Sequence, residues 1–133
     1  MNMKETILFA DAGQTARGSE RRTEDAHRLI GELLLRMGIG PHLVGFDPLC
    51  EGIRILAEQD REAGFSPADV FPLIEELCGV TNGEHAVRDA ICAGFLHPEE
   101  IHSQIFPFSN RPSNCEFICT LAELVRNRIR SRT

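Results

Sequence analysis

The residues that could carry catalytic chemistry in this chain are its adjacent carboxylates and its histidines. Glu75-Glu76 and Glu99-Glu100 are acidic pairs, and five histidines are scattered over 133 residues. Acid–base or nucleophilic catalysis would need such groups beside a nucleophile, a phosphate loop or a metal motif. The sequence has no G-x-x-x-x-G-K-[ST], H-E-x-x-H, G-x-S-x-G or G-x-G-x-x-G pattern. We therefore expect solvated acidic helix faces, a hydrogen-bonded loop residue at His42, and no enzymatic activity.

Cysteines form a second set of reactive side chains. They are Cys50, Cys78, Cys92, Cys115 and Cys119. Cys115 and Cys119 are four residues apart and would share a helix face, as two metal ligands do, but no second pair completes a zinc site. No C-x-x-C pair occurs, so the pattern favours free thiols in a reducing compartment, with neither a metal nor a cofactor.

A helix predicted after Gly79 presents a third set of polar groups. Its apolar residues, expected to face the core, are Ala86, Val87, Ala90 and Ile91. The remaining positions, expected to point outward, are Asn82, His85, Arg88 and Asp89. Asparagine can read adenine, arginine can read guanine, and Thr81 could bond a phosphate from the start of the helix. The spacing alone favours a two-helix corner that binds no nucleic acid, because most such corners in α-helical proteins bind none.

Helical periodicity extends over most of the chain. The first helix is predicted from Thr23, its N-cap, to Gly38. Its apolar face consists of Ala26, Leu29, Ile30, Leu33, Leu34 and Met37. Asp47 is expected to cap a second helix that has Pro48 at its first position and ends near Gly64. Its apolar face consists of Leu49, Ile53, Leu56 and Ala57.

Two capping boxes predict the next helices. Ser66 with Asp69 opens a helix that contains Pro72 and ends near Cys78, and Thr81 with Glu84 opens a helix that ends near Gly94. A short helix at about 98–106 and a last helix at about 114–130 follow. The last helix is expected to bury Phe117, Ile118, Leu121, Leu124 and Val125. We expect an all-α bundle of about six helices with a helix-turn-helix at about 67–94.

Composition limits the class of protein. A single domain fits 133 residues, and 14 basic against 20 acidic residues give a net charge of −6. This charge argues against nonspecific binding of polyanions, since phosphate contacts require a basic surface. No apolar run approaches the roughly 18 residues of a membrane span, and no secretory signal is recognisable, so a cytoplasmic protein that does not enter the membrane is expected.

Three stretches of the chain resemble a known family. They are G-I-G-P-H-L-V-G-F-D-P-L (38–49), E-H-A-V-R-D-A-I (84–91) and R-P-S-N-C-E-F-I (111–118). Together they resemble the C-terminal effector domain of the stage 0 sporulation protein A family of response regulators. That family has a glycine-bounded P-x-H or P-A-H loop, an E-R-A-I-R-H-A-I recognition helix and a K-P-T-N-S-E-F-I string. The resemblance covers about residues 27–130 and implies a six-helix effector domain, here 23–133, that binds promoter DNA as tandem subunits.

The resemblance implies which residues contact DNA. By position they are Thr81, Asn82, Glu84, His85 and Arg88. Glu84 and Arg88 match the family pattern, whereas Asn82 and His85 replace arginines. Two lysines that precede the turn in the family are here replaced by Glu75 and Glu76, and Gly83 replaces a branched apolar residue. The basic character that the family brings to DNA is therefore largely missing.

The segment 1–22 forms a separate N-terminal arm. Its apolar run Ile7-Leu8-Phe9-Ala10 is followed by Asp11, and it resembles the first strand of a receiver domain or a linker remnant. The rest of a receiver, with its phosphoacceptor aspartate, is missing, which implies that the chain is not switched by its own phosphorylation. A lone apolar strand tends to pair with another chain, so we expect the arm to cross between the subunits of a homodimer.

Two functions follow. The first is a sequence-specific DNA-binding regulator of sporulation protein A type without a receiver. The second is a protein-interaction module that has lost DNA binding and pairs with, or titrates, a full-length response regulator. A positive stripe beside Arg88 would favour the first, and a continuous acidic face would favour the second.

Overall fold

The computed structural model describes residues 24–59, 67–79 and 81–132, and within these residues the only regular structure is helical. The first described helix covers 24–36, followed by α2 (Phe46–Glu58), α3 (Pro67–Cys78), α4 (Gly83–Gly94), α5 (Glu100–Ile105) and α6 (Asn114–Arg132). The prediction of an all-α fold with about six helices is confirmed. The expected N-cap at Thr23, the capping box beginning at Ser66 and the arm 1–22 lie outside the described residues.

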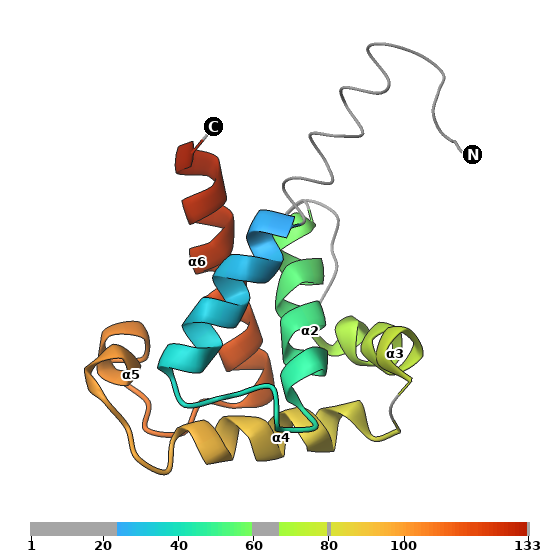
Figure 1. Ribbon diagram of the computed structural model, residues 1–133, viewed down its shortest axis with the longest axis horizontal. Helices are drawn as coiled ribbons and strands as arrows, with labels where there is room; N and C mark the ends of the chain where they lie inside the picture. The colour runs from blue at the N-terminus through green and yellow to red at the C-terminus, as the bar shows by residue number, and fades with distance from the viewer. Residues whose placement is uncertain (1–23, 60–66, 80, 133) are drawn as a thin grey trace.

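The central helix is α2, which packs against α3, α4 and α6. Helix 24–36 and α6 lie on one side of it and α3 on the other, and α4 runs across one end of this group (Figure 1). The buried residues of α2 are Pro48, Leu49, Cys50, Gly52, Ile53, Ile55, Leu56 and Ala57. A helix with apolar residues around most of its circumference belongs in the interior, which explains the position of α2.

Aromatic rings fill the core where α6 begins. Phe117 is fully buried, its ring is stacked on Phe106 with centroids 5.4 Å apart, and Phe95 meets it edge-on at 6.3 Å. The prediction that Leu124 is buried is wrong, because 41% of its surface is exposed. The predicted apolar stripe of α6 is wider than the part that packs on the core, and Leu124 instead borders an open groove near Leu33.

The bounds of α2 differ from the sequence prediction at both ends. The helix begins at Phe46 with Gly45 as N-cap, so Asp47 is in its first turn rather than at its cap. It ends at Glu58, because Gln59 is extended (ψ 147°), and so it does not run to Gly64. No basic residue occupies its last turn. Arg126 of α6 supplies that charge, since its guanidinium donates to the carbonyls of Leu56 and Ala57.

His102 is a buried polar residue that connects three segments. Its side chain is 4% exposed, and Nδ1 accepts a hydrogen bond from the Glu99 N–H at 2.9 Å. Nδ1 is therefore unprotonated and Nε2 carries the proton. That N–H lies between two carbonyl oxygens, of Met37 at 3.0 Å and Gly94 at 2.9 Å. One imidazole thus joins the end of helix 24–36, the end of α4 and the start of α5.

A charged network connects helix 24–36 to α2. His27 Nε2 lies 2.7 Å from Glu51 Oε2, and Arg54 Nη2 donates to Glu51 Oε1 at 2.8 Å. Partial burial would raise the pKa of Glu51, but the hydrogen bonds from Arg54 and His27 outweigh it and hold this pKa below its usual range. The ionised carboxylate is thus favoured in the folded state.

Glu51→Gln is expected to reduce the sensitivity of the fold to acid. A carboxyl group whose pKa is lowered by folding adds stability above its unfolded pKa, and that stability is lost as the pH falls through the folded pKa. The wild-type chain should therefore lose more stability than Glu51→Gln between about pH 5 and pH 3. Urea unfolding followed by circular dichroism at several pH values measures this. Parallel acid profiles for the two proteins would contradict it.

Candidate functional site

The region in which the sequence predicted a DNA-binding site is the α3–α4 corner, residues 67–94, described except for residue 80. Two left-handed residues shape its turn: Gly79 has φ +66°, and Asn82 has φ 56° and ψ 50°. Glycine and asparagine are the residues that adopt this conformation most readily. α4 therefore begins at Gly83, with Asn82 as an N-cap that makes no side-chain capping bond. The predicted Thr81–Glu84 capping box is wrong.

The start of α4 is capped instead by α3. Glu75 Oε2 accepts a hydrogen bond from the Gly83 N–H at 2.8 Å, which places a carboxylate at the positive end of the α4 dipole. A Cβ atom on Gly83 would lie 3.0 Å from Glu75 Cγ, so the glycine makes room for this side chain. Two departures from the family pattern, Glu75 and Gly83, are thus parts of one contact. The sequence pattern predicted a solvated position for Glu75 and did not indicate this contact.

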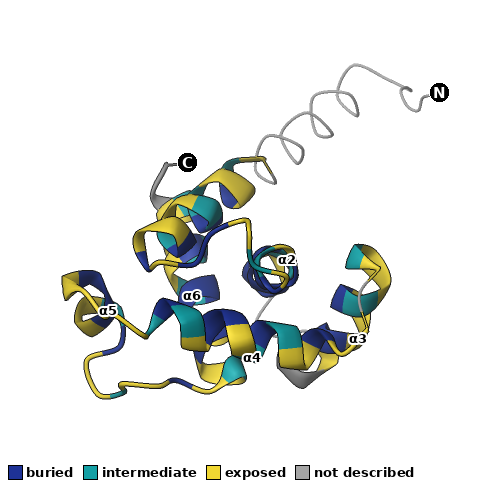
Figure 2. Ribbon diagram, turned by 60° about the horizontal axis from the view of Figure 1, so that its bottom comes forward, coloured by how far each residue is buried: buried dark blue, intermediate teal, exposed yellow. Residues whose placement is uncertain are grey.

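Each of the five predicted contact residues has a definite position. Thr81 and Asn82 are exposed and precede the helix. Glu84 and His85 are exposed in the first turn, and His85 Nε2 lies 3.4 Å from Asp89 Oδ2. Arg88 is only half-exposed, and its guanidinium is bonded to the Pro112 carbonyl in the loop before α6. Seen from the α4 side, exposed residues line the outer surface of α4 and the neighbouring loop that leads to α6 (Figure 2).

The loop before α6 is bonded directly to α4. Arg88 Nη1 donates to the Pro112 carbonyl at 3.1 Å, and Asn114 Nδ2 donates to the Glu84 carbonyl at 2.9 Å. Ser113 caps α6, since its Oγ accepts from the Glu116 N–H at 3.1 Å. Residues 111–114 (R-P-S-N) therefore connect the start of α6 to α4 through hydrogen bonds.

The family-like stretch 38–49 also contacts α4. Gly45 is buried against it, and a Cβ atom at that position would lie 2.2 Å from the Ala86 carbonyl oxygen. The loop 38–45 and the R-P-S-N string thus contact α4 from different segments of the chain. The residues in which this chain matches the family support α4, whereas the exposed positions Asn82 and His85 are those at which it departs.

Electrostatically the corner is acidic. Asp69, Glu75, Glu76, Glu84 and Asp89 are its carboxylates. Arg88 is the only arginine or lysine among the described residues of 67–94, and its guanidinium is bonded to Pro112. The nearby loop adds Arg111, which is exposed, and Phe108, which is 99% exposed. An acidic surface with an exposed aromatic ring in a neighbouring loop is more typical of a protein contact than of a phosphate contact.

Comparison with known proteins identifies no relative. No protein-family model, curated protein or solved structure matches the chain. Within the described ranges, no helix has the length and apolar character needed to cross a membrane. The described residues also contain no group of three His, Cys, Asp or Glu side chains placed to hold a metal ion. All five cysteines are free thiols in the structure.

Arg88→Ala is expected to lower the stability of the fold. The substitution removes the bond to the Pro112 carbonyl, a charge-assisted contact worth about 1 to 3 kcal/mol. Arg111→Ala is the matched control, because Arg111 is exposed in the same loop and should change stability by less than about 0.5 kcal/mol. Urea unfolding of both variants measures the difference. Equal stability of the two variants would show that the Arg88 contact contributes nothing to the fold.

Proposed function

We propose that this chain is a protein-interaction module of sporulation protein A type that has lost DNA binding and pairs with a full-length regulator of that family. The carboxylate of Glu75 at the Gly83 N–H carries this proposal. A DNA reader leaves the first N–H groups of its recognition helix, or a cation beside them, available for phosphate. Here a negative group occupies that place and would repel a phosphate.

Two further contacts support the loss of DNA binding. The Arg88 guanidinium, which matches the family arginine, is bonded to Pro112, and the His85 ring is beside the Asp89 carboxylate. The two side chains of α4 that could donate to a base or phosphate, Arg88 and His85, thus each have a partner within the chain. Every lost phosphate contact also removes the affinity that counterion release would provide.

The partner follows from charge complementarity. The family resembled here carries two lysines before its turn and arginines in its E-R-A-I-R-H-A-I helix. A basic corner of this kind is complementary to an acidic corner formed by Glu76, Glu84 and Asp89. Phe108, exposed in the adjoining loop, provides an apolar anchor of the type that dominates binding energy in protein interfaces. Pairing through these surfaces would withdraw the regulator from its promoter.

A competition experiment tests this function. A fluorescent duplex that carries the promoter box of the family is bound to an effector domain with the E-R-A-I-R-H-A-I helix, and anisotropy is followed as this chain is added. We expect release of the duplex, weaker at high salt, and no tighter binding of the chain to the box than to a scrambled duplex. Persistence of the effector–DNA complex at saturating chain would contradict the proposal.

Charge reversal provides the matched variants. Asp89→Lys should abolish competition, because it places a cation on the outer face of the acidic corner. Glu24→Lys makes the same change in net charge in helix 24–36, outside the corner, and should compete as the wild-type chain does. An equal loss of competition in both variants would show that net charge is responsible, and wild-type competition by both would show that the corner is not the binding surface.

A second candidate is a DNA-binding regulator, favoured by the convergence of all three family-like stretches on α4. In this case the chain would bind the promoter box more tightly than scrambled duplex throughout a salt series. Arg88→Ala would then cost about 1 to 3 kcal/mol at the specific site, as expected for a base-reading arginine. The anisotropy experiment separates the two candidates, because they differ in which molecule binds the labelled duplex.

A further inference from the structure

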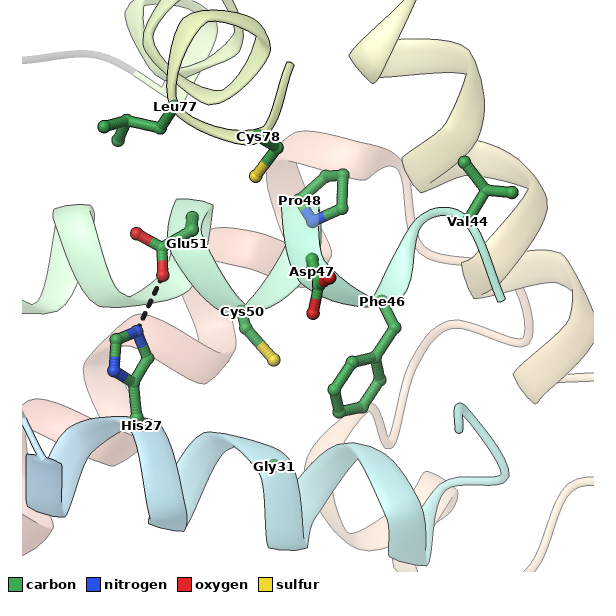
Figure 3. A pocket seen from close by; sticks show the side chains of 10 residues that line it. All are labelled: His27, Gly31, Val44, Phe46, Asp47, Pro48, Cys50, Glu51, Leu77 and Cys78. Atoms are coloured by element: carbon green, nitrogen blue, oxygen red, sulfur yellow. Dashed lines mark hydrogen bonds and ion pairs between the residues drawn. The ribbon is translucent and has the colours of Figure 1, made fainter. Parts of the chain in front are cut away.

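A cavity of about 600 Å³ opens between helix 24–36, the start of α2 and the end of α3 (Figure 3). Its lining residues are His27, Gly31, Val44, Phe46, Asp47, Pro48, Cys50, Glu51, Leu77 and Cys78. The volume is in the range of small-molecule sites in proteins, roughly 300 to 1,000 Å³. None of the five residues predicted to contact DNA lines it, so the cavity is distinct from the α3–α4 contact surface discussed above.

The walls of this cavity are part apolar and part polar. Val44 and Leu77 remain 73% and 61% exposed at its edges, and Phe46 and Pro48 complete the apolar surface. Burial, and then the nearby Asp47 carboxylate, raise the pKa of the Cys50 thiol to about 12. Burial also raises the pKa of the Cys78 thiol. Both thiols are therefore protonated at neutral pH and act as polarizable, uncharged wall groups.

The charged groups of the cavity are mainly negative. Asp47 is exposed in the first turn of α2, and its carboxylate has no hydrogen-bond or ion-pair partner among the described residues. Glu51 is ionised, and His27, the only basic residue of the lining, lies against Glu51 (Figure 3). The exposed carboxylate of Asp47, next to the apolar residues Phe46 and Pro48, is thus left to pair with a cation supplied from outside.

Gly31 is a separate indication that this space is kept open. It lies within helix 24–36, where glycine is less favourable than alanine. A Cβ atom there would have no neighbour within 4 Å, so packing within the described fold does not require glycine. A larger side chain would enter the cavity without displacing the backbone. The absence of a side chain at Gly31 therefore leaves space on this side of the cavity.

We propose that this cavity binds a small organic cation, an amine or guanidinium group on an apolar body, with the charge at Asp47 and the body against Phe46, Pro48 and Leu77. The neutral thiols and the space at Gly31 accommodate the apolar part. Site and ligand match in both charge and polarity, as small-molecule sites do when a few placed polar groups orient an apolar ligand.

Three indole probes of matched shape test the proposal on the full chain. Tryptamine carries an amine, tryptophol a hydroxyl and indole-3-propionate a carboxylate. Tryptamine should shift the amide signals of Gly31, Asp47 and Leu77 in proton–nitrogen spectra, with an affinity about tenfold above that of tryptophol. Indole-3-propionate should bind more weakly than either. Equal affinity for the three probes, or no shift at millimolar tryptamine, would overturn the proposal.

Substitutions at two positions complete the test. Gly31→Leu should fill the cavity and reduce tryptamine affinity at least about tenfold, whereas Gly31→Ala adds one methyl group and should retain binding. Leucine and alanine both favour helix, so thermal unfolding should show that each variant folds. Asp47→Asn should lower the affinity for tryptamine to that for tryptophol. Unchanged affinity in Gly31→Leu or in Asp47→Asn would refute the assignment.

Discussion

Gly45→Ala is expected to destabilise the fold by at least about 2 kcal/mol, because overpacking against backbone cannot be relieved by a side-chain rotation. The new methyl carbon would lie 2.2 Å from the Ala86 carbonyl oxygen and 2.8 Å from Ala90 Cβ. Gly45 has φ −81° and ψ −2°, a conformation open to any residue, so the whole effect comes from this contact. To relieve it, the start of α2 must move away from α4.

Gly31→Ala is the matched control for this prediction. The same methyl group at Gly31 meets nothing within 4 Å, and alanine is favoured over glycine in a helix by roughly 1 kcal/mol. Thermal and urea unfolding should therefore show opposite shifts, a loss for Gly45→Ala and a small gain for Gly31→Ala. Similar stabilities for the two variants would mean that α2 does not pack on α4 as closely as the structure has it.

His102→Ala is expected to cost about 2 to 4 kcal/mol of unfolding free energy. The substitution leaves the Glu99 N–H without its acceptor and the carbonyls of Met37 and Gly94 without a shared donor. It also removes the edge-on contact with Phe95, whose ring centroid is 4.8 Å from the imidazole centroid. Unsatisfied buried backbone groups are more costly than the average lost hydrogen bond.

His97→Ala provides the comparison for His102. His97 is exposed in the segment between α4 and α5, so its removal should change stability by less than about 0.5 kcal/mol. Amide hydrogen exchange adds a local measurement, since only His102→Ala should speed exchange across α5. If His102→Ala and His97→Ala have the same stability, the three-way contact of the imidazole is not formed in solution.

Hydrophobic periodicity predicted most of the fold. The apolar face of α2 is buried as expected, that of α4 is buried except for the half-buried Ala86, and α6 begins at Asn114 as expected. These predictions depend only on the local spacing of apolar residues, which can be read directly from the sequence. The prediction that Leu124 is buried was wrong because the spacing of apolar residues identifies a helix face but not how far the neighbouring helices extend along it.

Contacts between distant residues could not be predicted. Glu75 reaches the start of α4 only because the turn holds two left-handed residues, and nothing in the pattern of glutamates indicated this. In the sequence His102 is one of five scattered histidines, and nothing there indicates its hydrogen bonds to the carbonyls of Met37 and Gly94. The E-x-x-H spacing at Glu99 was a signal, because it has the form of a capping box in which histidine replaces the usual glutamate or glutamine.

Arg88 shows why a matched motif does not establish a function. The family pattern placed an arginine at this position, and the base-reading chemistry of arginine made it a DNA contact. In the structure the same guanidinium holds the loop before α6. A residue can therefore match a family pattern because it maintains the scaffold, and only its surroundings distinguish this role from recognition.

The guanidinium of Arg126 has a consequence for the order in which the chain folds. It bonds to the end of α2 from about 70 residues further along, at the carbonyl of Ala57 and at that of Leu56, which also accepts from the Gln59 N–H. During synthesis α2 is made well before α6, and until α6 is made the end of α2 lacks this guanidinium. Contacts over such long sequence separations slow folding. We therefore expect the end of the central helix to gain full protection only after α6 has been made, although this helix is among the first to be made.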